Sequence, residues 1–113
     1  MTLAVQRLDA DVSVAPQLAP EAMAEAAAAG FKSVINNRPD FEGGPTQPTN
    51  ASIEAAARAA GLEYAFLPVA GNFQSPEEIA RFGELLATLP GPVLAFCRTG
   101  TRSGKLWQAA VGR

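Results

Sequence analysis

The residues best suited to chemistry in this 113-residue chain lie together at positions 97–103, where the sequence is Cys-Arg-Thr-Gly-Thr-Arg-Ser. Cys97 is the only cysteine, and as a thiolate it would be a nucleophile. The guanidinium of Arg102 can donate two parallel hydrogen bonds to an oxyanion. The pattern therefore predicts an anion-binding loop around Cys97 and Arg102. The remaining residues expected to bind the anion are Arg98, Thr99, Gly100, Thr101 and Ser103.

The segments on either side of this loop favour a catalytic cysteine. Residues 92–96 form a short apolar run, typical of a buried parallel strand, and residues 103–111 are predicted to form a helix. Because a helix N-terminus and a nearby guanidinium both favour a thiolate, we expect the pKa of Cys97 to be lowered. The alternative is that Cys97 only fills space at the end of a strand.

Composition excludes several other kinds of chemistry. The chain has no histidine and one cysteine, so Ser-His and Cys-His dyads, internal disulfides and cysteine clusters for zinc are impossible; no metal or cofactor is expected. A net charge of −2 argues against nucleic acids and membrane surfaces as partners. The first residues do not resemble a signal peptide, and we expect a cytoplasmic protein, where a free thiol stays reduced.

Strand and helix patterns alternate along the chain. This order predicts one α/β domain over residues 1–113, with a mostly parallel central sheet flanked by helices and the Cys-x4-Arg loop after its last parallel strand. The predicted strands are residues 3–8, 12–14, 31–36, 62–69 and 92–96, and the predicted helices are 20–29, 50–60, 76–88 and 103–111.

The chain also resembles a known family, the phosphatase-like domain of the beta-lactamase hydrolase-like proteins. The resemblance covers nearly all of the chain and rests on residues 31–40 (FKSVINNRPD), 61–69 (GLxYxxLPV) and 92–103 (PVLAFCRTGTRS). It implies the fold of the dual-specificity cysteine phosphatases. In some bacteria this domain is fused to a persulfide-dioxygenase-like metallo-β-lactamase domain, which implies a place in sulfide metabolism.

Three departures from the phosphatase pattern favour sulfur over phosphorus. Four residues separate Cys97 from Arg102, which is similar to rhodaneses, whereas cysteine phosphatases have five. Phe96 replaces their histidine, and residues 70–73 contain no aspartate where they carry a general acid. A poor oxygen leaving group needs such an acid, worth roughly 10²–10⁴-fold in rate, whereas sulfite or a low-pKa thiolate leaves unprotonated. We therefore predict a rhodanese-like sulfurtransferase that forms a Cys97 persulfide.

Two other functions remain open. One is a phosphatase with a phosphorylated Cys97, and the other is a non-catalytic anion-binding module. Asp40 or Glu42 is a candidate replacement acid, or else a solvated residue of a long loop, and Arg38 is either a second anion contact or structural. The expected partners are a small anionic sulfur donor or phosphate ester, a thiol acceptor such as glutathione, and a persulfide-dioxygenase-like enzyme.

Overall fold

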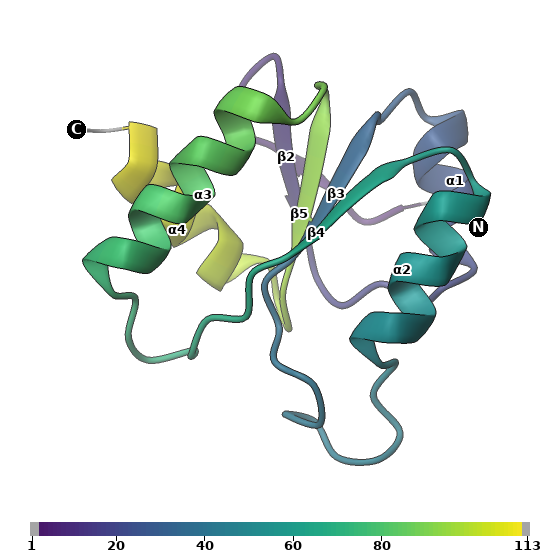
Figure 1. The fold of residues 1–113 in the computed structure, drawn as a ribbon, viewed down its shortest axis with the longest axis horizontal. Helices are drawn as coiled ribbons and strands as arrows, with labels where there is room; N and C mark the ends of the chain where they lie inside the picture. Colours follow the sequence, from purple (N-terminus) through teal and green to yellow (C-terminus); the bar gives the residue numbers. More distant parts are fainter. Residues whose placement is uncertain (1–2, 112–113) are drawn as a thin grey trace.

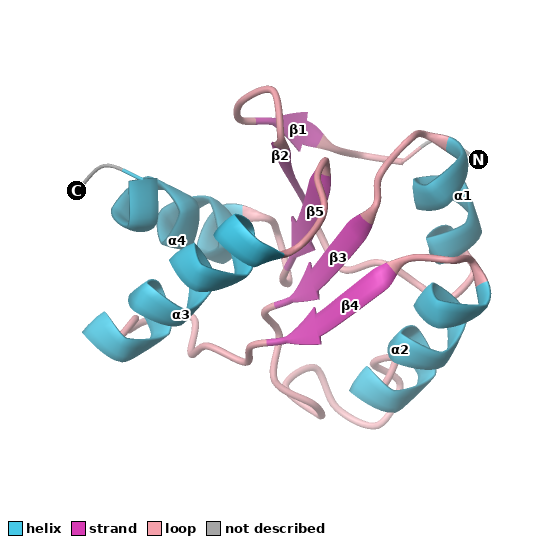
Figure 2. Ribbon diagram, turned by 45° about the horizontal axis from the view of Figure 1, so that its top comes forward, coloured by secondary structure: helices cyan, strands magenta, loops and turns pink. Residues whose placement is uncertain are grey.

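The computed structural model describes residues 3–111, which form a five-stranded sheet between two pairs of helices (Figure 1). The strand order is β1-β2-β5-β3-β4, in which β1 is antiparallel to β2 and the other pairs are parallel (Figure 2). This confirms the predicted α/β fold with a mostly parallel sheet. The elements are β1 Gln6–Arg7, β2 Val12–Ala15, α1 Ala22–Ala28, β3 Ser33–Asn36, α2 Asn50–Ala59, β4 Glu63–Phe66, α3 Pro76–Thr88, β5 Val93–Phe96 and α4 Thr101–Val111.

The central strand β5 is buried on both faces because a helix layer covers each of them. Leu94 and Phe96 contact the core beneath α1 and α2, whereas Val93 and Ala95 contact the core beneath α3 and α4. This alternation follows from the two-residue period of a strand. It explains why the apolar run before Cys97 is continuous in sequence, as a central parallel strand requires.

Two helices begin at residues whose side chains cap them. Thr49 accepts a hydrogen bond from the Ser52 amide at the start of α2. At the start of α3, the Ser75 hydroxyl and the Glu78 carboxylate each accept the other residue's backbone amide, at 3.1 and 2.8 Å. These contacts satisfy amides that have no partner inside the helix, so both boundaries are set locally.

Four of the five strands are shorter than predicted, whereas β2 extends one residue further, to Ala15. The strand expected at residues 3–8 is reduced to the two residues of β1, because the amides of Leu8 and Asp9 both bond to the carbonyl of Val12 and close a turn. The strand expected at residues 62–69 is reduced to the four residues of β4, which match β3 residue for residue. An apolar run shows which residues are buried, and it does not show where a strand ladder ends.

The last helix starts earlier than predicted, at Thr101 rather than at Ser103. The amide of Gly104 already bonds to the carbonyl of Gly100 at 3.0 Å, so the helix follows the cysteine loop without a linker. Because parallel strands share a direction, the loops after β2, β3, β4 and β5 meet at one edge of the sheet, where such folds bind ligands. Within residues 3–111, no helix is long and apolar enough to cross a membrane.

Candidate active site

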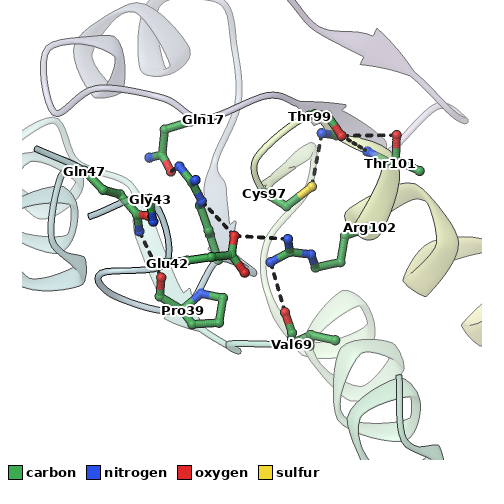
Figure 3. Close-up of polar contacts among 12 residues, drawn as sticks. Gln17, Pro39, Glu42, Gly43, Gln47, Val69, Cys97, Thr99, Thr101 and Arg102 are labelled. Carbon is green, nitrogen blue, oxygen red and sulfur yellow. Dashed lines mark hydrogen bonds and ion pairs between the residues drawn. The ribbon is translucent and has the colours of Figure 1, made fainter. Parts of the chain in front are cut away.

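Cys97 follows β5 directly and is 1% exposed. Its amide donates to the carbonyl of Ala15 at 3.3 Å, which ties the cysteine loop to the end of β2. Gly100 adopts a φ of 94°, a conformation that favours glycine, and its amide donates to Sγ of Cys97 at 3.1 Å (Figure 3). Since α4 begins at the next residue, the positive end of a helix also lies beside the thiol.

Opposing influences act on the Cys97 thiol. Burial is the largest single one and raises its pKa. The hydrogen bonds from the amide and hydroxyl of Ser103, together with those from the Thr99 and Gly100 amides, outweigh it and lower the pKa below its ordinary value. This direction agrees with the sequence-based expectation, and it favours the nucleophilic thiolate at a lower pH than for a free cysteine.

Arg102 lies at the first turn of α4 and is 9% exposed. Its Nη1 donates to the carbonyl of Val69 at 3.0 Å, and its Nη2 donates to Oε1 of Glu42 at 3.1 Å (Figure 3). Its Nε is buried and has no hydrogen-bond partner among the described residues. The Nε–H and the adjacent Nη2–H point the same way and form a fork for an oxyanion. Glu42 contacts only one arm of that fork.

Glu42 bridges two buried arginines. Its Oε1 accepts from Nε of Arg38 at 2.9 Å as well as from Arg102, although the two arginines are far apart in sequence. Burial raises the pKa of Glu42, but the hydrogen bonds and positive charges of Arg102 and Arg38 together lower it below its ordinary value. In the site as described, Glu42 is therefore a carboxylate that compensates both guanidinium groups.

The loop that carries Glu42 is held by side chains. Gln47 is buried, and its amide group accepts from the Gly43 amide at 2.7 Å and donates to the carbonyl of Pro39 at 2.9 Å. Phe41 has a φ of 64°, unusual for a bulky residue, and its side chain is 67% exposed. This turn sends Phe41 outward while the next side chain reaches the arginines, so the loop has a defined conformation.

Two pockets adjoin at the cysteine loop and share Arg98 and Arg102 in their walls. The smaller pocket has a volume of about 220 Å³ and the larger one about 610 Å³. Both carry more arginine and lysine than acid, as expected of a site for an anionic substrate. The smaller is lined by Gly71, Cys97, Arg98, Thr99, Thr101, Arg102 and Lys105, and the larger by Arg38, Glu42, Gly43, Arg98 and Arg102.

The structure brings most of the predicted site residues together, but it places Asp40 elsewhere. Oδ1 of Asp40 accepts the amide of Asn50 at 2.7 Å, so this carboxylate lies at the start of α2 and not at the arginines. Glu42, the other acid considered, is the one that reaches Arg102. Arg38 is buried and lines the larger pocket, where it bonds to Glu42.

Two further residues support the site: Gln17 was missed from the sequence, whereas Asn37 is expected at this rim because it follows the strand predicted at residues 31–36. The side-chain oxygen of Gln17 accepts from Nη1 of Arg38 at 3.1 Å, and its backbone amide donates to the carbonyl of Arg98 at 3.2 Å. Asn37 accepts the hydroxyl of Ser103 at 2.8 Å and donates to the carbonyl of Leu67. Both follow the carboxyl end of a strand at this sheet edge, and that position is the signal that could have identified Gln17.

Comparisons with known proteins identify relatives of the whole described chain. Residues 4–112 match the family described as "Beta-lactamase hydrolase-like protein, phosphatase-like domain". The Beta-lactamase hydrolase-like protein of Agrobacterium fabrum is 46% identical over 80 residues, which are 71% of this chain. The same match spans only 18% of that protein's length.

Solved structures share the fold. A Neisseria meningitidis protein provisionally named as a phosphatase is 34% identical, with a TM-score of 0.86 and coverage of 94% of this chain and 75% of that one. P. aeruginosa TpbA, solved in complex with pTyr, is 16% identical, with a TM-score of 0.71 and coverage of 97% and 65%. The family match and the Neisseria structure support the phosphatase alternative better than the predicted sulfurtransferase, and neither supports a rhodanese-like activity. TpbA shows the fold alone.

Proposed function

This chain belongs to the beta-lactamase hydrolase-like family, as its phosphatase-like domain, and we propose that it is a cysteine-dependent phosphatase with Cys97 as nucleophile. The observation that carries the proposal is the pairing of a lowered thiol pKa with the Arg102 fork in the same loop. A thiolate attacks well, and a guanidinium fork with helix-end amides stabilises the charge of a phosphoryl group. The proposed substrate is a small phosphate monoester.

In the first step, the Cys97 thiolate attacks phosphorus and forms an S–P bond. The P–O bond to the leaving group breaks, and its electron pair departs with the oxygen. In the second step, water attacks the phosphocysteine, the S–P bond breaks, and phosphate and the thiolate are released. Throughout, the oxygens of the phosphoryl group are held by Arg102 and by the amides of residues 98–103. The proposal includes a cytoplasmic location, where the thiol stays reduced.

A second candidate is sulfur transfer, and two observations favour it. Four residues separate Cys97 from Arg102, and Gly71 packs against the guanidinium where phosphatases carry an acid. In this reaction, the Cys97 thiolate attacks the sulfane sulfur of thiosulfate. An S–S bond forms as the old one breaks, and sulfite leaves with the electron pair. A thiol acceptor would then collect the sulfur, and a persulfide-dioxygenase-like enzyme would consume the product.

One set of assays separates the candidates. The purified protein is incubated with phenyl phosphate, with thiosulfate plus cyanide to detect thiocyanate, and with thiosulfate alone. Its intact mass is measured after phenyl phosphate and after thiosulfate alone. Release of phosphate and a transient gain of about 80 Da on Cys97 would support the phosphatase. Thiocyanate and a gain of about 32 Da would instead support sulfur transfer and contradict the main proposal.

Three variants complete the test. Cys97→Ser should abolish turnover in either reaction, and Arg102→Ala should slow either reaction. Arg58→Ala is the matched control, because Arg58 is an exposed residue of α2 whose salt bridge, to Glu54, lies within that helix. Absence of both products in the wild type would leave the non-catalytic anion-binding module as the remaining explanation.

A further inference from the structure

A phosphatase with this site needs a proton donor for its leaving group, and the expected position offers none. Residues 70–73, after β4, are Ala-Gly-Asn-Phe. Gly71 lies so close to Arg102 that an added Cβ would be 3.0 Å from Nη2, so this loop supplies packing and no acid. The proton must therefore come from another element, since an alkoxide or phenoxide leaves slowly without one.

Glu42 is the only carboxylate among the residues that line the two adjoining pockets. Its Oε1 lies 3.1 Å from Nη2 of Arg102, on the arm of the fork that an oxyanion would need. A bound phosphoryl group therefore displaces this oxygen from Arg102. The phosphoryl group leaves the contact with Arg38 in place, because Nε of Arg38 donates to the same oxygen at 2.9 Å and is not part of the fork. Arg38 thus keeps the carboxyl group at the rim of the occupied site.

The loop around Glu42 holds this side chain in a fixed orientation. Arg38 is itself fixed, because Nη1 donates to Gln17 and a Cβ on Gly43 would lie 2.7 Å from its Nη2. The Gln47 side chain closes the loop from Pro39 to Gly43, and Phe41 adopts a positive φ. A strained backbone position held by the hydrogen bonds around it is common where a side chain must be positioned for chemistry.

We propose that Glu42 is the acid–base residue of the reaction. Arg38 positions its carboxyl group, and Arg102 binds the same group until the substrate's anionic group replaces it. This inference rests on the proposed phosphatase function. In the first step, the carboxylic acid of Glu42 gives its proton to the leaving oxygen as the P–O bond breaks, and becomes a carboxylate. In the second step, that carboxylate takes a proton from the attacking water, which restores the acid as the S–P bond breaks.

Two charged groups contact Glu42: Arg38 after β3 and Arg102 on α4. Arg98 lines the same pocket, and the Cys97 thiol and Lys105 line the adjoining one. In the free site, the hydrogen bonds and charges of Arg102 and Arg38 outweigh burial and hold the pKa of Glu42 low. A phosphate dianion neutralises Arg102 and adds a negative charge, so it raises that pKa in the complex. We therefore expect both kcat and kcat/KM to fall as pH rises. The fall in kcat, which reports the complex, should occur at a higher pH than the fall in kcat/KM, which reports the free enzyme.

The test compares two substrates that differ in their leaving groups. Phenyl phosphate needs protonation of the leaving oxygen, and dinitrophenyl phosphate does not. Glu42→Gln keeps an oxygen that can accept from both arginines, so the loop is expected to stay folded. We expect this variant to lose 10²–10⁴-fold in kcat on phenyl phosphate and less than about tenfold on dinitrophenyl phosphate. The high-pH decline of kcat should disappear, and Glu42→Asp should recover part of the rate.

The matched control is Glu54→Gln, because Glu54 also forms an i,i+4 pair with an arginine at 3.1 Å, on the exposed side of α2. It should change neither rate. Equal losses on both substrates in Glu42→Gln, or an unchanged pH profile, would overturn the role of Glu42 while leaving the phosphatase proposal intact. Absence of phosphate release from both substrates in the wild type would overturn both.

Discussion

The hydroxyl of Ser103 donates a 2.8 Å hydrogen bond to Oδ1 of Asn37, which links the start of α4 to the end of β3. The orientation of Asn37 is fixed because its Nδ2 donates to the carbonyl of Leu67 at 3.0 Å. The same hydroxyl also lowers the pKa of Cys97, and it has a single proton to donate. When the thiolate forms, we therefore expect the Ser103 hydroxyl to turn its hydrogen bond from Asn37 to Sγ, since hydrogen bonds to charged acceptors are stronger.

Ser103→Ala should raise the pKa of Cys97. A hydrogen bond to a charged group is worth about 1.5–3 kcal/mol, and the bond to Asn37 is given up in exchange, so the rise should reflect only the difference between the two bonds. The pKa is measured from the pH dependence of alkylation by iodoacetamide. In Ser103→Ala, alkylation should require a higher pH than in the wild type.

The control for this measurement is Thr88→Ala, because the exposed hydroxyl of Thr88 bonds within α3 to the carbonyl of Glu84, away from the thiol. Its thiol pKa should match that of the wild type. An unchanged pKa in Ser103→Ala would mean that the hydroxyl stays on Asn37 in the thiolate state, and that the loop amides alone oppose burial.

Gly71→Ala should weaken anion binding without unfolding the protein. The new Cβ would lie 3.0 Å from Nη2 of Arg102, and Val69 and Glu42 restrict how far that guanidinium can shift. A displaced fork no longer meets an oxyanion with both donors, so we expect inorganic phosphate to bind more weakly by up to about tenfold, or about 1.4 kcal/mol. Calorimetric titration of the variant with phosphate measures this directly.

Gly104→Ala provides the comparison, because a Cβ at this position in α4 meets nothing within 4 Å. It should leave phosphate binding unchanged and stabilise the helix by about 0.5–1 kcal/mol, since glycine is a poor helix former. Phosphate affinity in Gly71→Ala equal to that of Gly104→Ala would show that the guanidinium tolerates the methyl group.

The parts of this structure that sequence predicts are those set by local signals. Ser75 and Glu78 cap α3, with Pro76 at its first turn, and the apolar run before Cys97 is typical of a strand that is buried on both faces. The anion loop is predictable for the same reason. Its glycine, its helix N-terminus and its thiol all lie within a few residues of one another.

The parts that sequence does not predict depend on contacts between distant residues. Glu42 and Arg102 are 60 positions apart, and the loop between β3 and α2 has no periodic pattern to show that it folds back. The i,i+4 spacing of Arg38 and Glu42 was a usable signal, but such pairs are ordinary on solvated surfaces. Asp40 is the other carboxylate considered in this loop and lies two residues away, but it accepts the Asn50 amide, and Phe41 with its positive φ lies between the two.

The stability that Glu42 contributes should depend on pH. Its pKa is lowered in the folded protein, so its contribution is complete above the unfolded-state pKa and is lost as pH falls through the folded-state value. Glu42→Gln should therefore destabilise the protein at neutral pH, and the difference should shrink below about pH 4, which is measured by urea unfolding at several pH values. The difference for Glu54→Gln, at an exposed pair, should be small at every pH; equal curves for the two variants would contradict the prediction.

Gln47→Ala should loosen the loop that carries Glu42. Gln47 is buried, and its removal leaves the amide of Gly43 and the carbonyl of Pro39 without their partner. Burying an unsatisfied polar group costs about 1–3 kcal/mol, and the loop can avoid this cost only by opening to water. We expect a loss of stability in urea unfolding of this order.

Opening of the loop would also release Glu42 from Arg102. Hydrogen exchange should then become faster at residues 39–47 and stay unchanged in β5, because the sheet does not depend on Gln47. If Gln47→Ala keeps wild-type exchange in the loop, the pair formed by Arg38 and Glu42 is sufficient to hold it. In that case the position of the Glu42 carboxylate at the anion site is determined by its contacts with the two arginines and not by the loop.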